Sequence, residues 1–434
     1  MNFNTLLRFL RSNYCTKLYA KELAENDNSK NQIYLGSDFS AITILPYQHI
    51  DKSDNAYKAK VELYWLNEEG KVEPAVRSQI ILYPQYPEVR FSGFLSGCHN
   101  PPSTILTARE SGRILFFGIT DDRKVIGFAV AKNDPLAEEF RRLKKSDQVG
   151  VFYNLTSFLA QKDIRNELIV NLRSIHEKGW IKSKRLDSNH NILPCKAPNC
   201  GGYTLEAEFG IVPNGKAEPD YHGWELKQHS VTAFTRYLKS IITLMTPEPT
   251  GGYYKTEGVI PFVKKYGYKD KLGRTDRYNF GGLHKANVTN PSTGLTLSLI
   301  GFDSRRSKIS DINGGIALVS KNGSNAALWG YEGLLSHWNK KHSNAVYVPS
   351  VVEKNPYLQY WFGNIIRLGR GTDFILFLNA LAEGKVYYDP GIKVEKISSK
   401  RPTTKRRSQF RIKSEDIPTL YKKMEVLDLL QVSP

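Results

Sequence analysis

The sequence predicts a two-domain protein, with a β-rich N-terminal domain followed by an α/β C-terminal domain. Short runs of alternating and β-branched residues dominate roughly the first third of the 434 residues, which is typical of a β-barrel or sandwich. A charged helical stretch, LAEEFRRLKK at 136–145, ends this pattern. Helical and strand-like spacings then mix, as in α/β domains. We therefore predict an N-terminal domain at 1–140, a linker at 141–160 and a C-terminal domain at 161–434.

The N-terminal domain is expected to consist of one helix followed by strands. The helix is predicted at Phe3–Asn13. Polar residues at Asn67–Gly70 and Asp121–Arg123 predict turns between consecutive strands. The strands predicted from alternation and β-branched content are Tyr57–Leu66, Ser78–Tyr83, Ile114–Ile119 and Val125–Ala131.

The C-terminal domain is expected to mix helices and strands. Apolar residues recur at helical spacing in Ile164–Lys178, which predicts a helix. The segments Phe234–Leu244 and Phe374–Leu381 are also expected to be helical or buried. Trp224–Gln228 is expected to be a strand.

The charge balance indicates a polyanionic partner. The chain carries 61 Lys plus Arg against 43 Asp plus Glu, a formal net charge of +18 at pH 7. Nucleic acid is the commonest partner of so basic a protein. Charge alone leaves two alternatives open. The net charge could serve only solubility, or the polyanionic partner could be an anionic membrane surface. No apolar run approaches the roughly 20 residues of a membrane span, and no secretory signal is present, so we expect no membrane association.

The cysteines indicate the compartment. Cys15, Cys98, Cys195 and Cys200 are few and dispersed, which fits a reducing cytosol. The cytoplasm is therefore the expected location. Half of a zinc site at Cys195 and Cys200 is an alternative, but structural zinc needs four ligands and no second Cys/His pair follows.

The segment EPDYHGWELK at 218–227 is the most informative part of the sequence. In the strand predicted there, Glu225 and Lys227 point to the same face and Leu226 to the opposite, packed face, because side chains alternate along a strand. Asp220 precedes a turn and is expected on the adjoining strand. Two carboxylates and an ammonium group would then converge.

These residue types suit metal-dependent hydrolysis of a phosphodiester. Mg²⁺ prefers carboxylate, carbonyl and water oxygens, and it neutralises the phosphate and lowers the pKa of a bound water. We predict that Asp220, Glu225 and the Leu226 carbonyl bind Mg²⁺. Lys227 is the predicted catalytic lysine, which orients the attacking water and stabilises the transition state. A solvated strand edge is the alternative, because so short a pattern also arises by chance.

A basic stretch, RPTTKRRSQFRIK at 401–413, holds six basic residues and no acidic one. Arg406, Arg407 and Arg411 could contact guanine, and Gln409 adenine, through paired hydrogen bonds to base edges in the major groove. Contact with phosphates alone, or a solvated face, is the alternative.

Residues ~165–415 resemble the MvaI/BcnI-type restriction endonucleases, which are related to the mismatch-repair nicking endonuclease MutH. The resemblance implies a PD-(D/E)xK nuclease fold, a mixed sheet flanked by helices, with DNA in a cleft. Five segments carry it in order: GWIKSKR at 179–185, GGYTLE at 201–206, PDYHGWELK at 219–227, LMTPEP at 244–249 and SQFRI at 408–412.

The same resemblance implies further site residues. Glu206 is expected near the site, where it would support the metal ion or the water, with an ordinary helix-surface carboxylate as the alternative. Arg411 matches the family's Phe-Arg-Ile arginine and is the preferred base-contacting residue. Asp389 and Lys393 lie where one branch of the family has an Asp-x-Arg pair, which is not reproduced in register here; they are candidates to contact cytosine and guanine. A prokaryotic, cytoplasmic monomer is implied.

Residues 1–140 resemble the B3-like effector domain of EcoRII-type restriction endonucleases. The resemblance rests on YAKELAEND at 19–27, continuing to Gln32, and on PEVRFS at 87–92. It implies an open β-barrel that grips the major groove with two arms. Asn31, Gln32, Tyr86, Glu88 and Arg90 are then DNA contacts, in which Arg pairs with guanine and Glu with cytosine. A scaffold barrel with Glu88 and Arg90 as a cross-strand ion pair is the alternative.

Both resemblances together predict a sequence-specific type II restriction endonuclease of the IIE kind. It would hydrolyse double-stranded DNA with Mg²⁺ at a short CCNGG-type site, CCWGG by the effector resemblance. The N-terminal domain would bind a second copy of the site and stimulate cleavage. A MutH-like mismatch-repair nicking endonuclease and a non-cleaving DNA-binding regulator are the alternatives.

Overall fold

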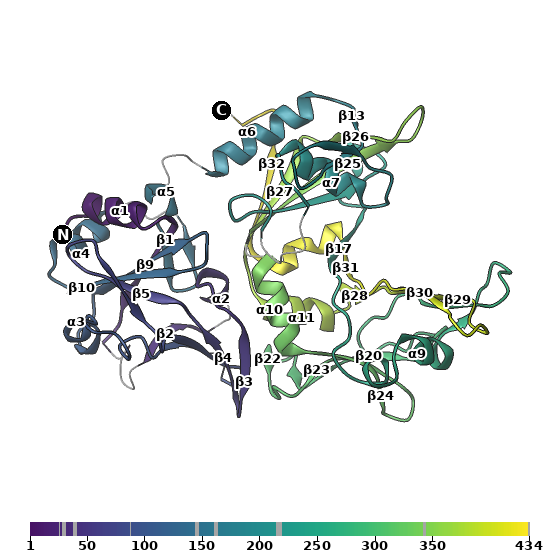
Figure 1. The fold of residues 1–434 in the computed structure, drawn as a ribbon, viewed down its shortest axis with the longest axis horizontal. Helices are drawn as coiled ribbons and strands as arrows, with labels where there is room; N and C mark the ends of the chain where they lie inside the picture. Colours follow the sequence, from purple (N-terminus) through teal and green to yellow (C-terminus); the bar gives the residue numbers. More distant parts are fainter. Residues whose placement is uncertain are drawn as a thin grey trace. The chain divides into compact units, whose positions relative to one another are not determined.

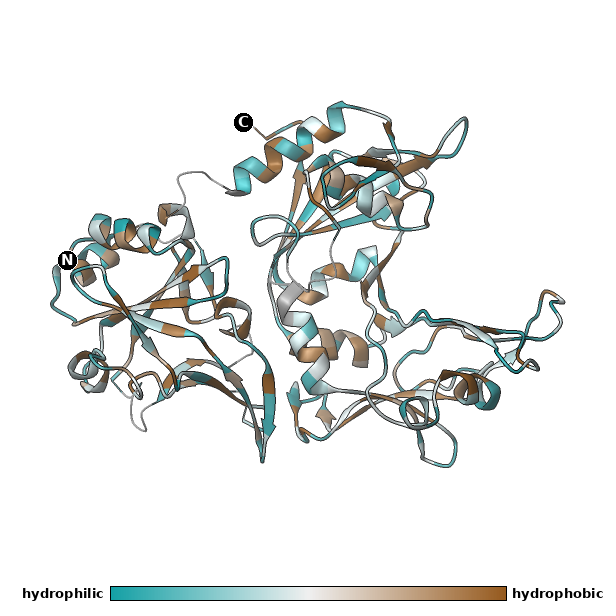
Figure 2. Cartoon of the chain, viewed as in Figure 1, coloured by the Kyte–Doolittle hydropathy of each residue, from teal (hydrophilic) through white to brown (hydrophobic). Residues whose placement is uncertain are grey.

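The structure is a computed structural model that describes residues 1–25, 27, 32–37, 41–86, 88–143, 147–159, 164–213, 219–341 and 344–432. The chain divides into two compact units (Figure 1), an N-terminal unit at Met1–Val170 and a C-terminal unit at Asn171–Ser433. Apolar residues gather on the strands and on the helix Phe374–Ala382, whereas the hairpin ends are mostly polar (Figure 2).

The described strands of the N-terminal unit form two sheets, so the unit is mainly β as the sequence predicts. The helices are α1 (Phe3–Ser12), α2 (Ala41–Ile44), α3 (Ser103–Thr107), α4 (Pro135–Arg142) and α5 (Thr156–Leu159). The seven-stranded sheet has the order β11 (Gln148–Val149), β12 (Phe152–Asn154), β1 (Cys15–Leu23), β9 (Arg113–Thr120), β10 (Val125–Val130), β5 (Leu63–Leu66) and β6 (Val72–Ala75). The five-stranded sheet has the order β2 (Gln32–Gly36), β8 (Glu88–Ser92), β7 (Gln79–Tyr83), β4 (Ala56–Lys60) and β3 (Ile50–Ser53).

Helices α1 and α4 cover part of the seven-stranded sheet. Leu6 and Leu10 of α1 are buried in one cluster with Phe116 of β9 and Phe140 of α4. The Phe116 and Phe140 rings meet edge to face, with centroids 5.7 Å apart. Burial of these apolar faces against the central strands forms the core of the unit.

The predicted strand Tyr57–Leu66 is split in the structure. Its first half is β4 and its second half is β5, and the two belong to different sheets. At the bend, Val61 N–H donates to the Ser78 carbonyl at 3.0 Å. The alternation of side chains continues through this bend, so the sequence pattern does not reveal it.

Residues 148–159, within the range predicted as a linker, are folded with the N-terminal unit. They form β11, β12 and α5, and β12 pairs with β1 through Tyr19 and Asn154. The division between the units falls after Val170. The sequence pattern missed this because the two strands have only two and three residues.

The C-terminal unit is built around a mixed six-stranded sheet, in the order β13 (Ile181–Lys182), β26 (Gln359–Phe362), β25 (Asn344–Glu353), β27 (Ile365–Thr372) and β32 (Tyr421–Asp428), with β16 (Glu225–Ser230) parallel to β25. The helices are α6 (Ile164–Glu177), α7 (Cys200–Glu208), α8 (Tyr253–Glu257), α9 (Val259–Tyr266), α10 (Tyr331–Lys341) and α11 (Phe374–Ala382), with 3-10 turns η1 (Phe234–Arg236) and η2 (Ser414–Leu420). The smaller sheets are β14 (Lys184–Leu186) with β15 (Ile192–Pro194); β17 (Ile241–Met245), β31 (Phe410–Lys413) and β28 (Val386–Tyr388); β18 (Tyr268–Lys269), β19 (Arg277–Gly281), β29 (Gly391–Glu395) and β30 (Thr403–Lys405); β20 (Thr296–Ile300), β23 (Gly315–Val319) and β24 (Asn325–Gly330); and β21 (Phe302–Asp303) with β22 (Lys308–Ile309).

The two segments of this unit that were expected to be helical or buried have different outcomes. Phe374–Leu381 is helical as α11, where the Asp373 side chain caps the helix by accepting from Ile375 N–H at 2.7 Å. Phe234–Leu244 is not a helix but the turn η1 followed by the strand β17. Ile242 and Leu244 of β17 are buried while Ile241 is exposed, so a strand period accounts for this segment.

Within the described residues, none of the helices combines the length and the apolar character needed to span a bilayer.

Candidate active site

Strand β16 forms the centre of the candidate site, and it lies parallel to β25. Glu225 and Lys227 share one face of β16 and Leu226 faces the other way, because side chains alternate along a strand. The side chain of Glu225 is 3% exposed and that of Lys227 is 17% exposed. Leu226 is buried, and β25 places Tyr347 opposite Lys227. The carboxylate and the ammonium group therefore lie together in a mostly buried setting.

Asp220 approaches β16 through a tight turn, not from an adjoining strand, which corrects the expectation for this residue. Tyr221 and Trp224 exchange two main-chain hydrogen bonds, of 2.9 and 2.7 Å. Gly223 has a φ of 87°, a conformation that favours glycine. The chain reverses there, and Asp220 Oδ2 accepts a hydrogen bond from Leu226 N–H at 3.0 Å.

The turn is held by one residue from the second half of α6 and one that directly follows α7. Asn171 of α6 donates from Nδ2 to the Tyr221 hydroxyl at 3.1 Å. The Phe209 ring, which follows α7, meets the Tyr221 ring edge to face at 4.8 Å. These contacts fix the loop that carries Asp220.

Lys227 and Glu225 form a close ion pair. Lys227 Nζ donates to Glu225 Oε1 at 2.6 Å. Burial by itself would lower the pKa of Lys227, but the Glu225 carboxylate outweighs burial and raises this pKa above its ordinary value. Lys227 is therefore a cation at neutral pH, available as a hydrogen-bond donor.

A buried polar group lies on the same face of the sheet, and sequence reasoning gave it no role. His229 of β16 binds Ser240 Oγ through Nδ1 at 2.7 Å. Burial, and then the positive charge of Arg367, lowers the pKa of His229 to about 3. Arg367 is buried and donates to Ser414. Strand alternation puts His229 on the same face as Glu225 and Lys227, so their two-residue spacing could have indicated that His229 lies near the site. Arg367 comes from a distant strand, and no local sequence pattern links it to the site.

Helix α7, which carries Glu206, packs against β16. A Cβ atom at Gly201 would lie 2.6 Å from Gln228 Oε1, so glycine allows α7 to approach the strand closely. Glu206 lies in the last turn of this helix and is half-buried. The structure thus places Glu206 on an element that contacts β16.

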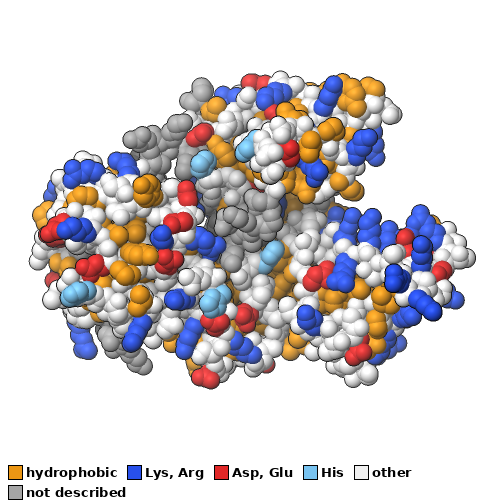
Figure 3. All heavy atoms as spheres, viewed as in Figure 1, with side chains coloured by type: hydrophobic (Ala, Val, Ile, Leu, Met, Phe, Trp, Pro, Cys, Tyr) orange, Lys and Arg blue, Asp and Glu red, His pale blue; other side chains and the backbone are white. Residues whose placement is uncertain are grey.

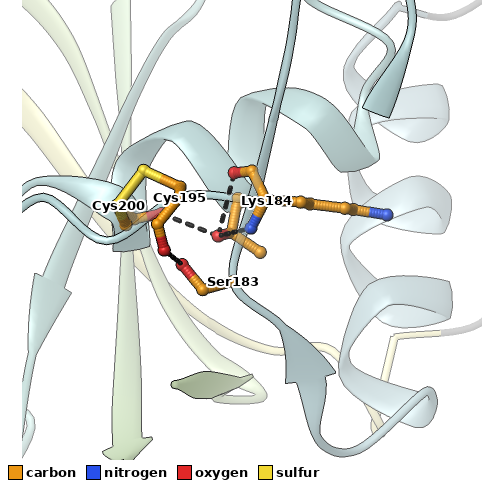
Figure 4. The surroundings of a disulfide bond; sticks show 5 residues. Ser183, Lys184, Cys195 and Cys200 are labelled. Carbon is orange, nitrogen blue, oxygen red and sulfur yellow. Dashed lines mark hydrogen bonds between the residues drawn. A yellow bond between two sulfur atoms is a disulfide. The ribbon is translucent and has the colours of Figure 1, made fainter. Parts of the chain in front are cut away.

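A disulfide between Cys195 and Cys200 lies at the start of α7 (Figure 4). Ser183 Oγ donates to the Cys195 carbonyl at 2.8 Å, and Thr204 Oγ1 donates to the Cys200 carbonyl at 2.7 Å. The zinc alternative is wrong for this pair, because each sulfur is bonded to the other. The expectation of reduced thiols is also wrong for these two cysteines, whereas Cys15 and Cys98 are free.

The donor set of the site fits a hard cation. Asp220 and Glu225 supply carboxylates, and Leu226 supplies a main-chain carbonyl, within seven consecutive residues. Oxygen donors of this kind are the ligands that Mg²⁺ prefers. In the described part of the chain, no three His, Cys, Asp or Glu side chains gather as a metal-binding group.

The predicted base-contacting residues of this unit include an acid–arginine pair. Arg411 of β31 donates from Nη1 to Asp389 Oδ2 at 2.5 Å, across the pairing of β31 with β28. Asp389 N–H donates to the Gln409 carbonyl at 2.8 Å. Sequence spacing did not reveal this pair because its members are 22 residues apart. Lys393 lies on β29, while Arg406 and Arg407 are exposed beside it, and Lys and Arg side chains gather over this end of the unit (Figure 3).

Three of the predicted DNA contacts of the N-terminal unit, Gln32, Glu88 and Arg90, lie on its five-stranded sheet. Glu88 and Arg90 are two residues apart on β8, and Arg90 Nε donates to Glu88 Oε1 at 2.6 Å. Their ion pair is therefore within one strand and not across strands. Gln32 begins β2, and Tyr86 is 73% exposed. Asn31 lies outside the described residues.

Comparisons with known proteins bear on the C-terminal unit. The solved complex of the restriction endonuclease MvaI with its cognate DNA substrate is 19% identical, with a TM-score of 0.46, and the match covers 62% of this chain and 99% of that one. MvaI in the absence of DNA is 17% identical, with a TM-score of 0.34, over 62% of this chain and 98% of that one. A search of curated proteins finds no match.

A family model gives the assignment. Residues 169–421 match the model of the MvaI/BcnI restriction endonuclease family. This range is more than half of the chain and contains the turn, β16, α7 and β31. The protein therefore belongs to the MvaI/BcnI restriction endonuclease family, and it is a nuclease that acts on DNA.

Proposed function

We propose that the protein is a sequence-specific, Mg²⁺-dependent type II restriction endonuclease whose N-terminal unit is an effector domain. The observation that carries the catalytic part is the arrangement of Asp220, Glu225 and Lys227. Asp220 is hydrogen-bonded to the strand that carries the other two, and Glu225 holds Lys227 at 2.6 Å. This set supplies the ligands and the cation that phosphodiester hydrolysis needs.

In this proposal the catalytic residues have distinct roles. Asp220, Glu225 and the Leu226 carbonyl hold Mg²⁺, with Glu206 as a supporting residue on α7. Bound Mg²⁺ supplies charge neutralisation at the scissile phosphate and a water of lowered pKa. Lys227 remains protonated and donates a hydrogen bond that orients the attacking water or stabilises the transition-state charge.

The acid–arginine pairs support recognition of G·C base pairs in duplex DNA. In the major groove, guanine presents two acceptors, O6 and N7, and cytosine presents one donor, N4. Arg411 beside Asp389 presents donors next to an acceptor, and Arg90 beside Glu88 does the same. Such pairs suit a CCNGG-type site, and we propose CCWGG. Gln409, Arg406, Arg407 and Lys393 supply further contacts.

The N-terminal unit has a different proposed role. We infer that Arg90, Glu88, Gln32, Tyr86 and Asn31 bind a second copy of the site, so that one cytoplasmic monomer holds two copies of double-stranded DNA. The basic net charge of +18 supports binding to the phosphate backbone. Binding at this unit would stimulate cleavage at the other.

One assay tests the proposal against its alternatives. The full-length protein is incubated with Mg²⁺ and plasmids that carry CCWGG, CCSGG or no CCNGG sequence, and the ends are mapped. We expect double-strand breaks at CCWGG only, and no cleavage with EDTA. Nicks without breaks would instead support a mismatch-repair type of nickase. Binding without any cleavage would support a DNA-binding regulator.

A further inference from the structure

A pocket outside the residues considered so far lies on the five-stranded sheet of the N-terminal unit. It has a volume of about 310 Å³. Three cationic side chains and a histidine line it, against a single carboxylate, which gives it an excess of positive charge. The lining residues are His49, Asp51, Lys58, Lys60, Val76, Arg77, Ser78 and Gln79.

The sheet holds the two lysines on one side of the pocket. Tyr57 and Ala59 of β4 are fully buried, so the intervening Lys58 and Lys60 point to the outer face. Lys60 lies opposite Gln79 of β7 in the antiparallel register. The two lysines therefore lie at neighbouring positions on one face of the sheet.

Ser78 adds a polar group without a partner. It is fully buried, and its hydroxyl forms no hydrogen bond within the described residues. Its main chain is held, because its carbonyl accepts from Val61 N–H and its N–H donates to the Ala75 carbonyl. Buried hydroxyl groups are normally hydrogen-bonded. The Ser78 hydroxyl is therefore available to donate a hydrogen bond to a ligand.

We propose that this pocket, the phosphate pocket (His49, Lys58, Lys60, Arg77 and Ser78), binds a backbone phosphate of duplex DNA. Two lysines and an arginine supply charge, and the serine hydroxyl supplies a neutral donor for a phosphate oxygen. The proposal rests on the proposed DNA-binding function of the N-terminal unit and extends it to a site that contacts no base.

The register places the phosphate pocket at a suitable distance from the proposed base contacts. Arg90 lies opposite Ile81, and Ile81 lies opposite Lys58, so the three share one face. Lys58 and Arg90 are therefore two strand spacings apart, about 10 Å. The major groove is about 12 Å wide. A side chain in the groove and a phosphate at its edge fit this separation.

Lysine protection in the full-length protein tests the phosphate pocket directly. The protein is treated with an amine-acylating reagent, without divalent metal, in the presence of a CCWGG duplex, of inorganic phosphate or of neither, and each lysine is quantified by mass spectrometry. We expect Lys58 and Lys60 to lose reactivity several-fold with duplex. Lys71 and Lys132, exposed lysines of the same unit outside the pocket, serve as controls and should change little.

Two variants give a second measurement. Lys58→Ala with Lys60→Ala should lower the slope of log affinity against log salt by about 0.9, the value for the loss of one phosphate contact. The control pair Lys71→Ala with Lys132→Ala removes the same charge and should leave the slope unchanged. Ser78→Ala should weaken duplex binding without loss of thermal stability, because the hydroxyl has no partner in the described protein.

The outcomes separate this proposal from the proposed function. Equal lysine reactivity with and without duplex, or equal slopes for the two double variants, would overturn the phosphate pocket. Protection by inorganic phosphate but not by duplex would also overturn it, because the pocket would then be a site for the free ion. Failure of a duplex to stimulate cleavage would contradict the effector role alone, since lysine protection does not depend on stimulation.

Discussion

At the scale of single residues, the protonation state of Lys227 depends on one neighbouring residue, Glu225. Its side chain is mostly buried, and an isolated ammonium group in such a setting would tend to lose its proton. Glu225, at 2.6 Å, reverses this tendency and raises the pKa of Lys227. The two residues therefore form one unit, in which Glu225 keeps the side chain of Lys227 positively charged.

Lys227→Ala should abolish most cleavage and keep DNA binding. Loss of one positioned donor to a developing negative charge lowers the rate by roughly 10²–10³-fold. Single-turnover cleavage and duplex binding in the absence of metal measure the two effects. Lys321→Ala, in an exposed turn of the same unit, is the control and should cut normally. Near-normal cleavage by Lys227→Ala would place the active site elsewhere.

His229 predicts a dependence of stability on pH. Its pKa is lowered from 6.5 to about 3 by burial, and by the charge of Arg367. Between these values the unfolded chain binds a proton that the folded protein excludes, so stability falls as the pH drops below 6.5. From pH 7 to pH 5 this single group should lower the free energy of unfolding by about 2 kcal/mol.

Urea unfolding of the protein and of His229→Gln at both pH values checks this prediction. Glutamine does not titrate, so the variant should lose correspondingly less stability between pH 7 and pH 5. An identical loss in the two proteins would show that His229 titrates normally when folded.

At the scale of elements, close packing of β27 against Tyr421 connects the sheet to the candidate site. A Cβ atom at Gly369 of β27 would lie 2.7 Å from the Tyr421 ring. The Tyr421 hydroxyl is hydrogen-bonded to the Tyr347 hydroxyl at 2.9 Å, and Tyr347 lies opposite Lys227. A change at Gly369 should therefore reach β16 through the buried rings of Tyr421 and Tyr347.

Gly369→Ala should destabilise the C-terminal unit by about 1–3 kcal/mol, the usual cost of overpacking, and it should slow cleavage. Chemical unfolding and cleavage rates measure both effects. Gly333→Ala is the matched control, since a Cβ atom there meets nothing within 4 Å and the residue lies in α10. That change should raise stability by roughly 0.5–1 kcal/mol. Equal effects of the two substitutions would contradict this account.

The pairing of β28 with β31 predicts coupled base recognition. Arg411 and Asp389 share a hydrogen bond of 2.5 Å, so removing either should change how the other contacts a base in the proposed complex with DNA. Arg411→Ala should cost about 1–3 kcal/mol of discrimination at one G·C pair. Cleavage of duplexes substituted at each position measures this loss, and the double variant with Asp389→Asn should show less than the sum of the two effects. A loss equal for all sequences would mark Arg411 as a phosphate contact.

At the scale of the whole molecule, the division into two units predicts separable functions. Glu88→Ala or Arg90→Ala should remove stimulation of cleavage by an added CCWGG duplex. A coupling free energy of 1–3 kcal/mol corresponds to roughly 5–150-fold stimulation in the unaltered protein. The ratio of cleavage rates with and without the added duplex measures it. Stimulation that persists in both variants would contradict the effector role of these residues.

Sequence reasoning was most successful where a local period carries the information. The helix α6 follows from apolar residues at helical spacing, and α1, α4 and β16 form where a helix, a charged helix and a strand were expected. Sequence reasoning failed where the composition of a segment is compatible with both a helix and a strand. Phe234–Leu244 is apolar enough for a buried helix, yet β17 pairs with β31 at the other end of the unit's sequence. A local pattern cannot contain such a distant partner.

The sequence by itself determined which candidate site residues the protein carries and how they are spaced along the chain. The order of Asp220, Glu225 and Lys227 along a short segment and the alternation of a strand suffice to put Glu225 and Lys227 on one face. Only the tertiary structure decided what surrounds them. Tyr347 and Arg367 reach the site from strands more than a hundred residues away, and Asp389 meets Arg411 across two paired strands. Such contacts depend on sheet order and register, which arise from packing of the whole unit and leave no mark in local spacing.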